Sequence, residues 1–318
     1  MKATTKGYIL GAIAAISYGT NPLFAVPLYD MGMQAPSVLF YRYAFATLIL
    51  GLVMRLRKES FRLTMGEIPM MIGLGVMFAL SSLLLFEAYN HMDVGLASTM
   101  LFVEPVFVAL LLWIFFRQKT SAVTLISIGV SLMGVTLLCN PGEGAHVTPI
   151  GVVLVMASSL TYAVYMIMIN KSRLRRLSGS ALTFYSLLFG IIVFALRLNF
   201  FSDLQPVPSD GLAWSCVIGL SVVPTIVSLM TVAIAIQCVG SVAVSILGAL
   251  EPITGLLFGV AIFGEVLTPR AVLGIIFILG SVVILVLAEP IMHYSASAFQ
   301  RLAGAAHILR HSGAQRRR

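Results

Sequence analysis

Long apolar runs alternate with short polar segments along the chain, and their lengths predict its architecture. Each run is close to the roughly 20 residues that a helix needs to cross the hydrocarbon core of a bilayer. Strands of a membrane β-barrel are shorter and alternate apolar with polar residues, a pattern that this sequence does not show. We therefore expect an all-α polytopic membrane protein with ten transmembrane helices. The predicted spans are residues 7–26, 36–54, 68–90, 94–116, 122–139, 149–169, 179–198, 212–236, 240–263 and 270–288.

Composition supports the same class. Of the 318 residues, 59% are hydrophobic and 10% are charged, whereas a soluble domain carries about 25% charged residues. The 3 cysteines are far apart and show no paired spacing, so we expect neither a disulfide framework nor a metal site. No cofactor is expected.

The basic residues, which give a net charge of +8, follow the predicted topology. With the N-terminus in the cytoplasm, all but three of the 20 basic residues fall in inside segments. Arg42 lies within a span, and Arg197 and Arg270 lie outside. This positive-inside bias predicts a multi-pass inner-membrane protein with cytoplasmic N- and C-termini and a basic cytoplasmic tail at residues 291–318. It also removes the reason to expect a nucleic-acid partner.

The two halves of the chain resemble each other in register, which indicates an internal duplication. The matched stretches are Tyr18 with Tyr162, "FYR" at 40–42 with "FYS" at 184–186, and Glu104-Pro105 with Glu251-Pro252. Each copy holds five spans, an odd number, so the second copy must enter the membrane in the opposite sense. Many secondary transporters are built from such inverted repeats. We expect the first repeat at residues 1–143 and the second at 144–290.

Several motifs resemble those of one transporter family. They are "FYRYAF" at 40–45, "LEPITGLLFGVAIFGEVLT" at 250–268 and "GIIFILGSVVIL" at 274–285. Together with the ten spans in two halves, they resemble the EamA family of the drug/metabolite transporter superfamily over residues 7–288. The resemblance implies a carrier of small metabolites, often an exporter of amino acids or related compounds. The chain departs from the family pattern at Glu87, where an apolar or aromatic residue is expected.

Glu104 and Glu251 lie in equivalent predicted spans, each directly before a proline. An ionisable residue at the bilayer centre costs about 2.5–3.5 kcal/mol on insertion scales, so it faces a cavity, a partner or the bundle interior. Pro105 and Pro252 each remove a backbone amide and predict a helix break. The break at Pro252 frees the carbonyl of Gly248, which then needs a partner or water. The glutamates are candidates for lining a substrate cavity; the alternative is that they only fix the kinks.

Arg42 and Glu87 are the other ionisable residues within spans. Arg42 is predicted on the order of 10 Å from the outer end of its helix. Its guanidinium suits a substrate carboxylate because the planar fork donates two hydrogen bonds; alternatively, it neutralises Glu104 or Glu87. Glu87 and His91 share one helix face, and a desolvated glutamate or a histidine is a candidate for proton coupling. The alternative is a polar helix end that meets lipid headgroups.

Polar residues in the first and sixth spans complete the candidate site. Asn21 directly precedes Pro22, a third predicted helix break, while Tyr162 and Tyr165 occupy the equivalent span of the second half. Polar side chains beside a proline break can line a cavity. Alternatively, these groups join helices through hydrogen bonds of about 0.6 kcal/mol each.

No nucleotide-binding or hydrolase motif is present, so we expect neither an enzyme nor an ATP-driven pump. The function predicted is secondary active transport by alternating access, in which a small polar, amino-acid-like metabolite is exported across the inner membrane. The expected partners are the metabolite and the lipid bilayer, with protons as a candidate coupling ion and a homodimer as a candidate assembly. The alternative is a membrane structural or receptor-like protein without a transport cycle.

Overall fold

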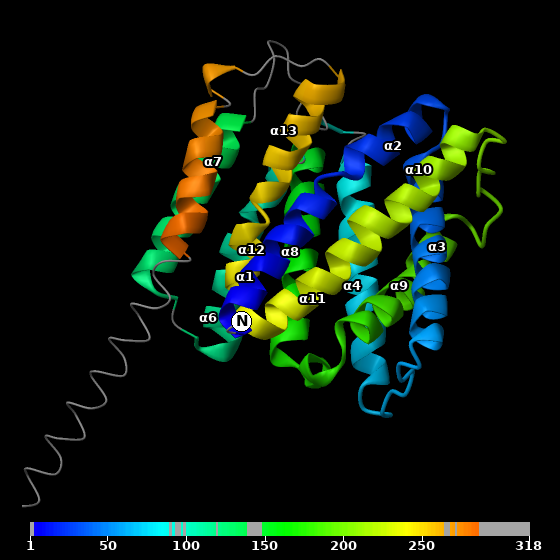
Figure 1. The fold of residues 1–318 in the computed structure, drawn as a ribbon, viewed down its shortest axis with the longest axis horizontal. Coiled ribbons are helices and arrows are strands. Elements are labelled where there is room, and N and C mark those ends of the chain that lie inside the picture. The colour runs from blue at the N-terminus through cyan, green and yellow to red at the C-terminus, as the bar shows by residue number, and fades with distance from the viewer. Residues whose placement is uncertain are drawn as a thin grey trace, which may run out of the picture.

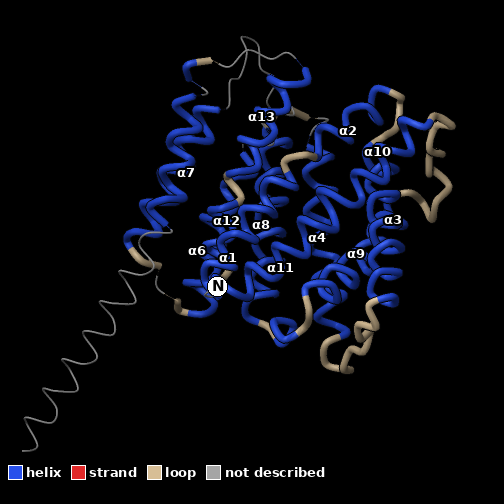
Figure 2. The backbone as a smooth tube through the Cα atoms, viewed as in Figure 1, coloured by secondary structure: helices blue, strands red, loops and turns tan. Residues whose placement is uncertain are grey.

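The fold consists of helices throughout the described residues (Figures 1 and 2). The computed structural model describes residues 3–88, 91–92, 97, 100–118, 120–138, 148–263, 268–270 and 272–285. The first half contains α1 (Ala3–Tyr18), α2 (Asn21–Asp30), α3 (Ala35–Leu56), α4 (Ile68–Ala88), a 3₁₀ turn (Leu101–Val103), α6 (Glu104–Phe116) and α7 (Ala122–Leu138). The second half contains α8 (Pro149–Lys171), a 3₁₀ turn (Arg173–Arg176), α9 (Gly179–Arg197), α10 (Gly211–Ser221), a π-helical turn (Val222–Val227), α11 (Ser228–Val239), α12 (Ser241–Leu247), α13 (Leu250–Phe263) and a last helix (Val272–Leu285). The predicted tail at 291–318 lies outside the described residues.

The predicted apolar spans coincide with these helices. Six helical segments are long and apolar enough to cross a membrane, and the described residues hold four shorter apolar helices besides. On α3, Leu48, Leu52 and Leu56 are 67%, 59% and 73% exposed. Soluble monomers rarely expose such contiguous apolar stripes, which suit a lipid environment. The prediction of an all-α polytopic membrane protein with ten spans is confirmed.

The two halves pack against each other through equivalent pairs of helices. α1 packs along α11, and α8, the counterpart of α1, packs along α4, the counterpart of the α10–α11 span (Figure 1). α3 also packs directly on its counterpart α9, and α6 packs on α12, which belongs to the counterpart span of the second half. At the level of whole spans, each of these contacts maps onto another, or onto itself, when the halves are interchanged. This is the arrangement that a two-fold relation between repeats produces.

The counterparts α3 and α9 run in opposite directions. Beyond the end of α3, the Glu59 carboxylate accepts a hydrogen bond from Ser180 at the start of α9. At the other end, the backbone amide of Gln205, which follows α9, donates to Ser37 Oγ near the start of α3 at 3.1 Å. Because equivalent helices are antiparallel, the second repeat is inverted relative to the first, as the odd number of spans predicts.

One end of the bundle is basic. The Lys171 ammonium lies 5.7 Å from the centroid of the Phe116 ring, and Arg175 donates to the carbonyl of Gln237 at 3.1 Å. The ends of α6, α8 and α11 therefore meet there (Figure 1). The described cations on the segments at this end are Lys6, Arg55, Arg57, Lys58, Arg62, Arg117, Lys171, Arg173, Arg175 and Arg176. Arg197 and Arg270 belong to helix ends on the opposite side.

A short cap precedes α4. The backbone amide of Thr64 donates to Glu67 Oε2 at 2.7 Å, and this hydrogen bond lowers the pKa of the Glu67 carboxyl. Side chains that bond to free amides near a helix start stabilise that end of the helix. Glu67 is partly exposed and thus stands apart from the buried polar groups of the bundle.

Small residues allow α4 and α9 to approach closely beside the core. A Cβ atom on Gly75 would lie 2.7 Å from the carbonyl oxygen of Ser186 and 2.9 Å from Cβ of Phe189. Similarly, a Cβ atom on Gly190 would lie 2.7 Å from the ring of Tyr43, which is fully buried. Interiors packed this tightly have low compressibility, so the packed helices have little room to shift. The core therefore holds α4 in place, and α4 carries one wall of the site described next.

Candidate functional site

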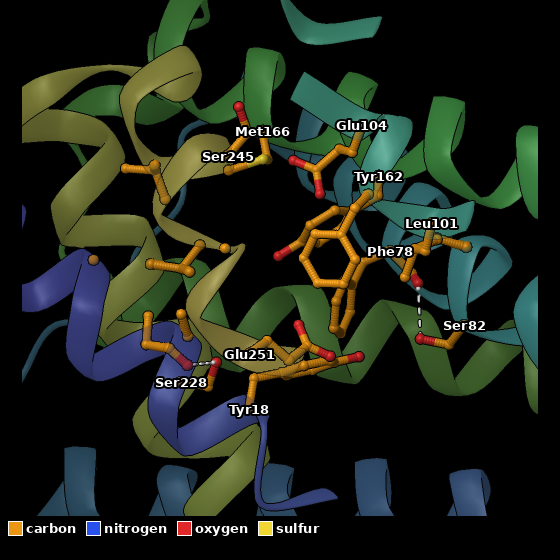
Figure 3. A pocket seen from close by; sticks show the side chains of 18 of the residues that line it. Tyr18, Phe78, Ser82, Leu101, Glu104, Tyr162, Met166, Ser228, Ser245 and Glu251 are labelled. Atoms are coloured by element: carbon orange, nitrogen blue, oxygen red, sulfur yellow. Dashed lines mark hydrogen bonds between the residues drawn. The ribbon is translucent and has the colours of Figure 1, made fainter. Parts of the chain in front are cut away.

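A cavity of about 60 Å³ lies where helices of both halves meet (Figure 3). One water molecule needs about 10–15 Å³ of such space, so the cavity can hold several. Its polar and charged lining comprises Tyr18, Ser81, Ser82, Glu104, Tyr162, Ser228, Ser245 and Glu251. Three of the residues predicted from the sequence therefore line it, namely Glu104, Tyr162 and Glu251. Asn21, Arg42, Glu87 and Tyr165 do not.

Glu104 reaches the cavity from a helix interruption. A 3₁₀ turn ends at Val103 and α6 begins at Glu104, so Pro105 occupies the first helical turn, where its missing amide costs nothing. The carbonyl of Leu101 accepts from the Glu104 amide and from Ser159 Oγ, the latter at 2.9 Å. Glu104 Oε1 is buried and has no hydrogen-bond partner within the described ranges. Buried polar atoms normally have a partner, so a donor from water or a ligand fits this position.

Glu251 has the equivalent setting in the second half. α12 ends at Leu247 and α13 begins at Leu250, so Glu251 and Pro252 lie in the first turn of α13. The sequence predicts that the carbonyl of Gly248 needs a partner or water. In the structure this oxygen accepts from the amide of Glu251 itself at 2.9 Å, because the chain tightens at the break. The partner that this carbonyl needs is thus a backbone amide of the interruption itself.

Aromatic rings form one wall of the cavity, beside the two glutamates. In Figure 3, Glu104 and Glu251 lie on opposite sides of the Tyr162 and Phe78 rings, with Tyr18 next to Glu251. The ring centroids of Tyr162 and Phe78 are 6.2 Å apart. Tyr165 stacks behind Tyr162 at 5.6 Å with an angle of 11° between the rings, and it is 1% exposed. Tyr165 therefore supports the wall and does not line the cavity.

The break in the first span lies at Gly19 and Thr20, just before α2, whose second residue is Pro22. Asn21 is the first residue of α2, and its side-chain amide donates to the carbonyl of Tyr18 at 2.9 Å. This hydrogen bond uses one of the carbonyls that α1 leaves unpaired at its end. Asn21 therefore joins the two helices instead of facing the cavity.

Arg42 is 3% exposed and its donors point to the second half of the chain. Nε donates to Thr225 Oγ1 at 2.6 Å and Nη2 donates to the carbonyl of Pro224 at 3.3 Å. Both acceptors lie in the π-helical turn. Within the described part of the chain, Arg42 therefore forms neither of the ion pairs that the sequence offered as alternatives, with Glu104 or with Glu87. Pro224 has no amide, which leaves the carbonyl of Leu220 without its usual helical donor. Thr225 Oγ1 donates to that carbonyl at 2.7 Å and is thereby oriented to accept from Arg42.

The Arg42 guanidinium also lies over the ring of Tyr18, with 5.4 Å from Cζ to the centroid. Since Tyr18 lines the cavity, this cation–π contact places Arg42 one layer behind the lining. Arg42 remains close enough for a coulombic interaction with Glu251. Its charge therefore acts on the cavity, although two of its hydrogen-bond donors bind groups of the π-helical turn.

Glu87 and His91 lie at the end of the bundle opposite the basic end. Glu87 pairs with Arg197 at 3.7 Å, and both side chains are partly exposed, at 39% and 49%. The carbonyl of His91 accepts from Thr148 Oγ1 at 2.9 Å. Neither residue lines the cavity. Asn90 and Asp93, predicted beside them, lie outside the described residues.

Sequence reasoning missed the hydroxyl groups of the site. Ser81 lies within hydrogen-bond distance of Ser158 on α8, at 3.2 Å, while Ser228 on α11 donates to the carbonyl of Ala14 on α1 at 3.0 Å. Each of these bonds joins the two halves across the cavity. The signal in the sequence is weak, because serine is common in membrane helices whichever way it faces.

Comparisons with known proteins agree over nearly the whole chain. The model of the EamA-like transporter family matches residues 5–140 and 149–287. An uncharacterized transporter from Archaeoglobus fulgidus is 28% identical over 273 residues, which cover 86% of this chain and 93% of that protein. Another from Clostridium kluyveri is 24% identical over 291 residues, with 87% and 92% covered. A crystal structure at 15% identity has the same fold, with a TM-score of 0.76 over 89% of this chain and 98% of that one.

Proposed function

The chain belongs to the EamA-like transporter family, and we propose that it is a secondary active carrier that exposes one central site alternately to each side of the membrane. Its cargo is a small polar metabolite, amino-acid-like, which it exports. Family membership makes the protein a membrane transporter and disfavours the alternative of a scaffold without a transport cycle.

The observation that carries the proposal is the position of the cavity between two inverted repeats. Each repeat contributes a glutamate from an equivalent helix break, Glu104 from one and Glu251 from the other. Transporters with inverted repeats bind their substrate at the interface of the repeats, at interrupted helices, and rock one repeat against the other. We take residues 1–143 and 144–290 as the two rocking units.

The proposed site consists of the cavity residues Glu104, Glu251 and Tyr162. Arg42, Asn21 and Tyr165 support these residues from behind, through the contacts to Tyr18 and the stacked ring described above. The breaks before Pro22, Pro105 and Pro252 give the helices the freedom to tilt at the site. Glu87 serves in this proposal as one half of the ion pair with Arg197 at the far end.

Energy comes from an ion gradient or from the gradient of the cargo. Protons are the coupling ion that we propose, carried by the cavity carboxyls, since a carboxyl in a water-poor site can exchange its charge for a proton. The basic end of the bundle faces the cytoplasm of an inner membrane, as the positive-inside rule requires. Export then means loading from the basic end and release at the other.

Transport in proteoliposomes tests the proposal. The full chain would be reconstituted, and the uptake and efflux of a panel of labelled amino acids and amines would be measured with and without an imposed proton gradient. We expect at least one panel member to move, and Glu104→Gln and Glu251→Gln to abolish most of that flux. Glu67→Gln is the matched control, because it removes one partly exposed carboxylate at the basic end and should keep full flux. Unchanged flux in both cavity variants would refute the site.

A further inference from the structure

The cavity is lined by two carboxyl groups, one from each half of the chain. Glu104 and Glu251 both line it and are close enough to repel each other. Arg42 interacts with Glu251 from behind the Tyr18 ring, and two of its N–H donors bind Thr225 and Pro224. Two carboxyl groups therefore face the space, with one partly shielded guanidinium behind them. When these carboxyls are ionised, a negative charge on the cargo is repelled and a positive charge is attracted.

The remaining walls also suit a cation. Tyr18, Phe78 and Tyr162 present aromatic rings to the same space, and the faces of such rings attract ammonium groups. Glu104 Oε1 is buried and lacks a donor within the described residues. An N–H group of a ligand would supply that donor, which a purely apolar or anionic ligand does not carry.

We infer that the cavity recognises an ammonium group, held between the carboxylates of Glu104 and Glu251 and against the rings of Tyr18, Phe78 and Tyr162. This inference rests on the proposed transport function and names its cargo: a primary amine or the amino end of an amino-acid-like metabolite. The protein recognises the cargo by its ammonium group, and a carboxylate of the cargo does not bind to Arg42.

The volume of the cavity fits the ammonium end of a small amine. Its volume of about 60 Å³ is space for several waters at about 10–15 Å³ each. It therefore admits an ammonium nitrogen with a few carbons, while a larger cargo needs the repeats to move apart. The hydroxyls of Ser82 and Ser245 also line the cavity and offer polar contacts to the rest of the cargo.

Three ligands of similar size and different charge test the inference. Ethylammonium, ethanol and acetate would be titrated into the purified full chain in detergent, and binding followed by saturation-transfer NMR. A ligand of three heavy atoms reaches at most about millimolar to submillimolar affinity, which this method detects. We expect ethylammonium to bind and ethanol and acetate to give no saturable signal. Equal binding of ethanol, or no binding of ethylammonium, would overturn the inference.

Variants then locate the site. Glu104→Gln should weaken ethylammonium binding at least tenfold, whereas Glu67→Gln, which removes a partly exposed carboxylate, should leave it unchanged. Tyr162→Leu removes the aromatic ring from the lining and should weaken binding several-fold. Elution profile and melting temperature report whether each variant is folded. Wild-type affinity in a folded Glu104→Gln or Tyr162→Leu protein would contradict the placement of the ammonium group.

The two proposals fail in different ways. If a panel metabolite is transported in proteoliposomes but ethylammonium neither binds nor competes with it, the transport function stands and ammonium recognition is wrong. If ethylammonium binds with the expected dependence on Glu104 while no panel member moves, the ammonium site stands and the transport proposal fails.

Discussion

Replacing Thr225 by valine should loosen the contact between α3 and the π-helical turn. Thr225 is fully buried, and its hydroxyl has two roles: it accepts from Arg42 Nε at 2.6 Å and donates to the carbonyl of Leu220 at 2.7 Å. Valine has nearly the same shape and no hydroxyl. The substitution therefore leaves a buried guanidinium N–H without this acceptor and a buried carbonyl without this donor.

The two lost hydrogen bonds set the magnitude. A hydrogen bond to a charged group contributes about 1.5–3 kcal/mol, and a neutral bond between membrane helices about 0.6 kcal/mol. Thr225→Val should therefore lower the free energy of unfolding by about 2–4 kcal/mol. Thr225→Ser keeps the hydroxyl and removes only one methyl group, for a loss of about 0.8 kcal/mol.

Equilibrium unfolding in mixed micelles of a neutral detergent and SDS, followed by circular dichroism, measures these differences. The same substitution in an Arg42→Met background isolates the pair, because there Thr225→Val can lose only the bond to Leu220. If valine proves as stable as serine at this position, or if its cost is the same with and without Arg42, the relay from Arg42 through Thr225 does not contribute to stability.

Three further predictions follow from the packing and the charges. Gly75→Ala should destabilise the fold by about 1–3 kcal/mol through overpacking, while Gly129→Ala, where a Cβ atom would meet nothing within 4 Å, should not; unfolding in mixed micelles would compare the two. In a background without the native cysteines, an impermeant maleimide should label Lys58→Cys from the cytoplasmic side and Asp203→Cys from the other, and the reverse pattern would overturn the proposed orientation. Because the folded-state pKa of Glu67 is lowered, wild type should melt above Glu67→Gln at neutral pH, and this gap should vanish as the pH falls through that lowered pKa; a gap that persists in acid would contradict the role of the cap.

Both glutamates of the cavity could be found in the sequence. A charged residue inside an apolar run is costly, and here the same pair of residues, glutamate then proline, occurs at equivalent places in both halves. Tyr162 carried a similar signal through its match with Tyr18. The serines of the lining carried none, since a hydroxyl in a membrane helix can bond to its own backbone and so fits a cavity, a helix contact or lipid equally well.

Arg42 shows where reasoning from sequence stopped. Substrate binding and an ion pair with a glutamate were the alternatives, and the acceptor is instead Thr225, 183 positions away. The equivalent contact in the other half joins α9 to α4, where Ser186 stands in place of Arg42 and Gly75 lets the backbones touch. One contact of the two-fold pair is thus held by hydrogen bonds and the other by close packing, and no spacing within either repeat reveals this.

The sequence by itself determined the number of spans, the duplication and the inversion. These follow from segment length, internal matches and charge bias. All three are local properties of the sequence, because each span is inserted according to its own length, hydrophobicity and flanking charges. Only the tertiary structure decided which polar groups share a cavity and which are used up by neighbours. The physical reason is that helix rotation and crossing are set by contacts such as Gly75 with α9 and Arg42 with the π-helical turn, between residues that are distant in the chain.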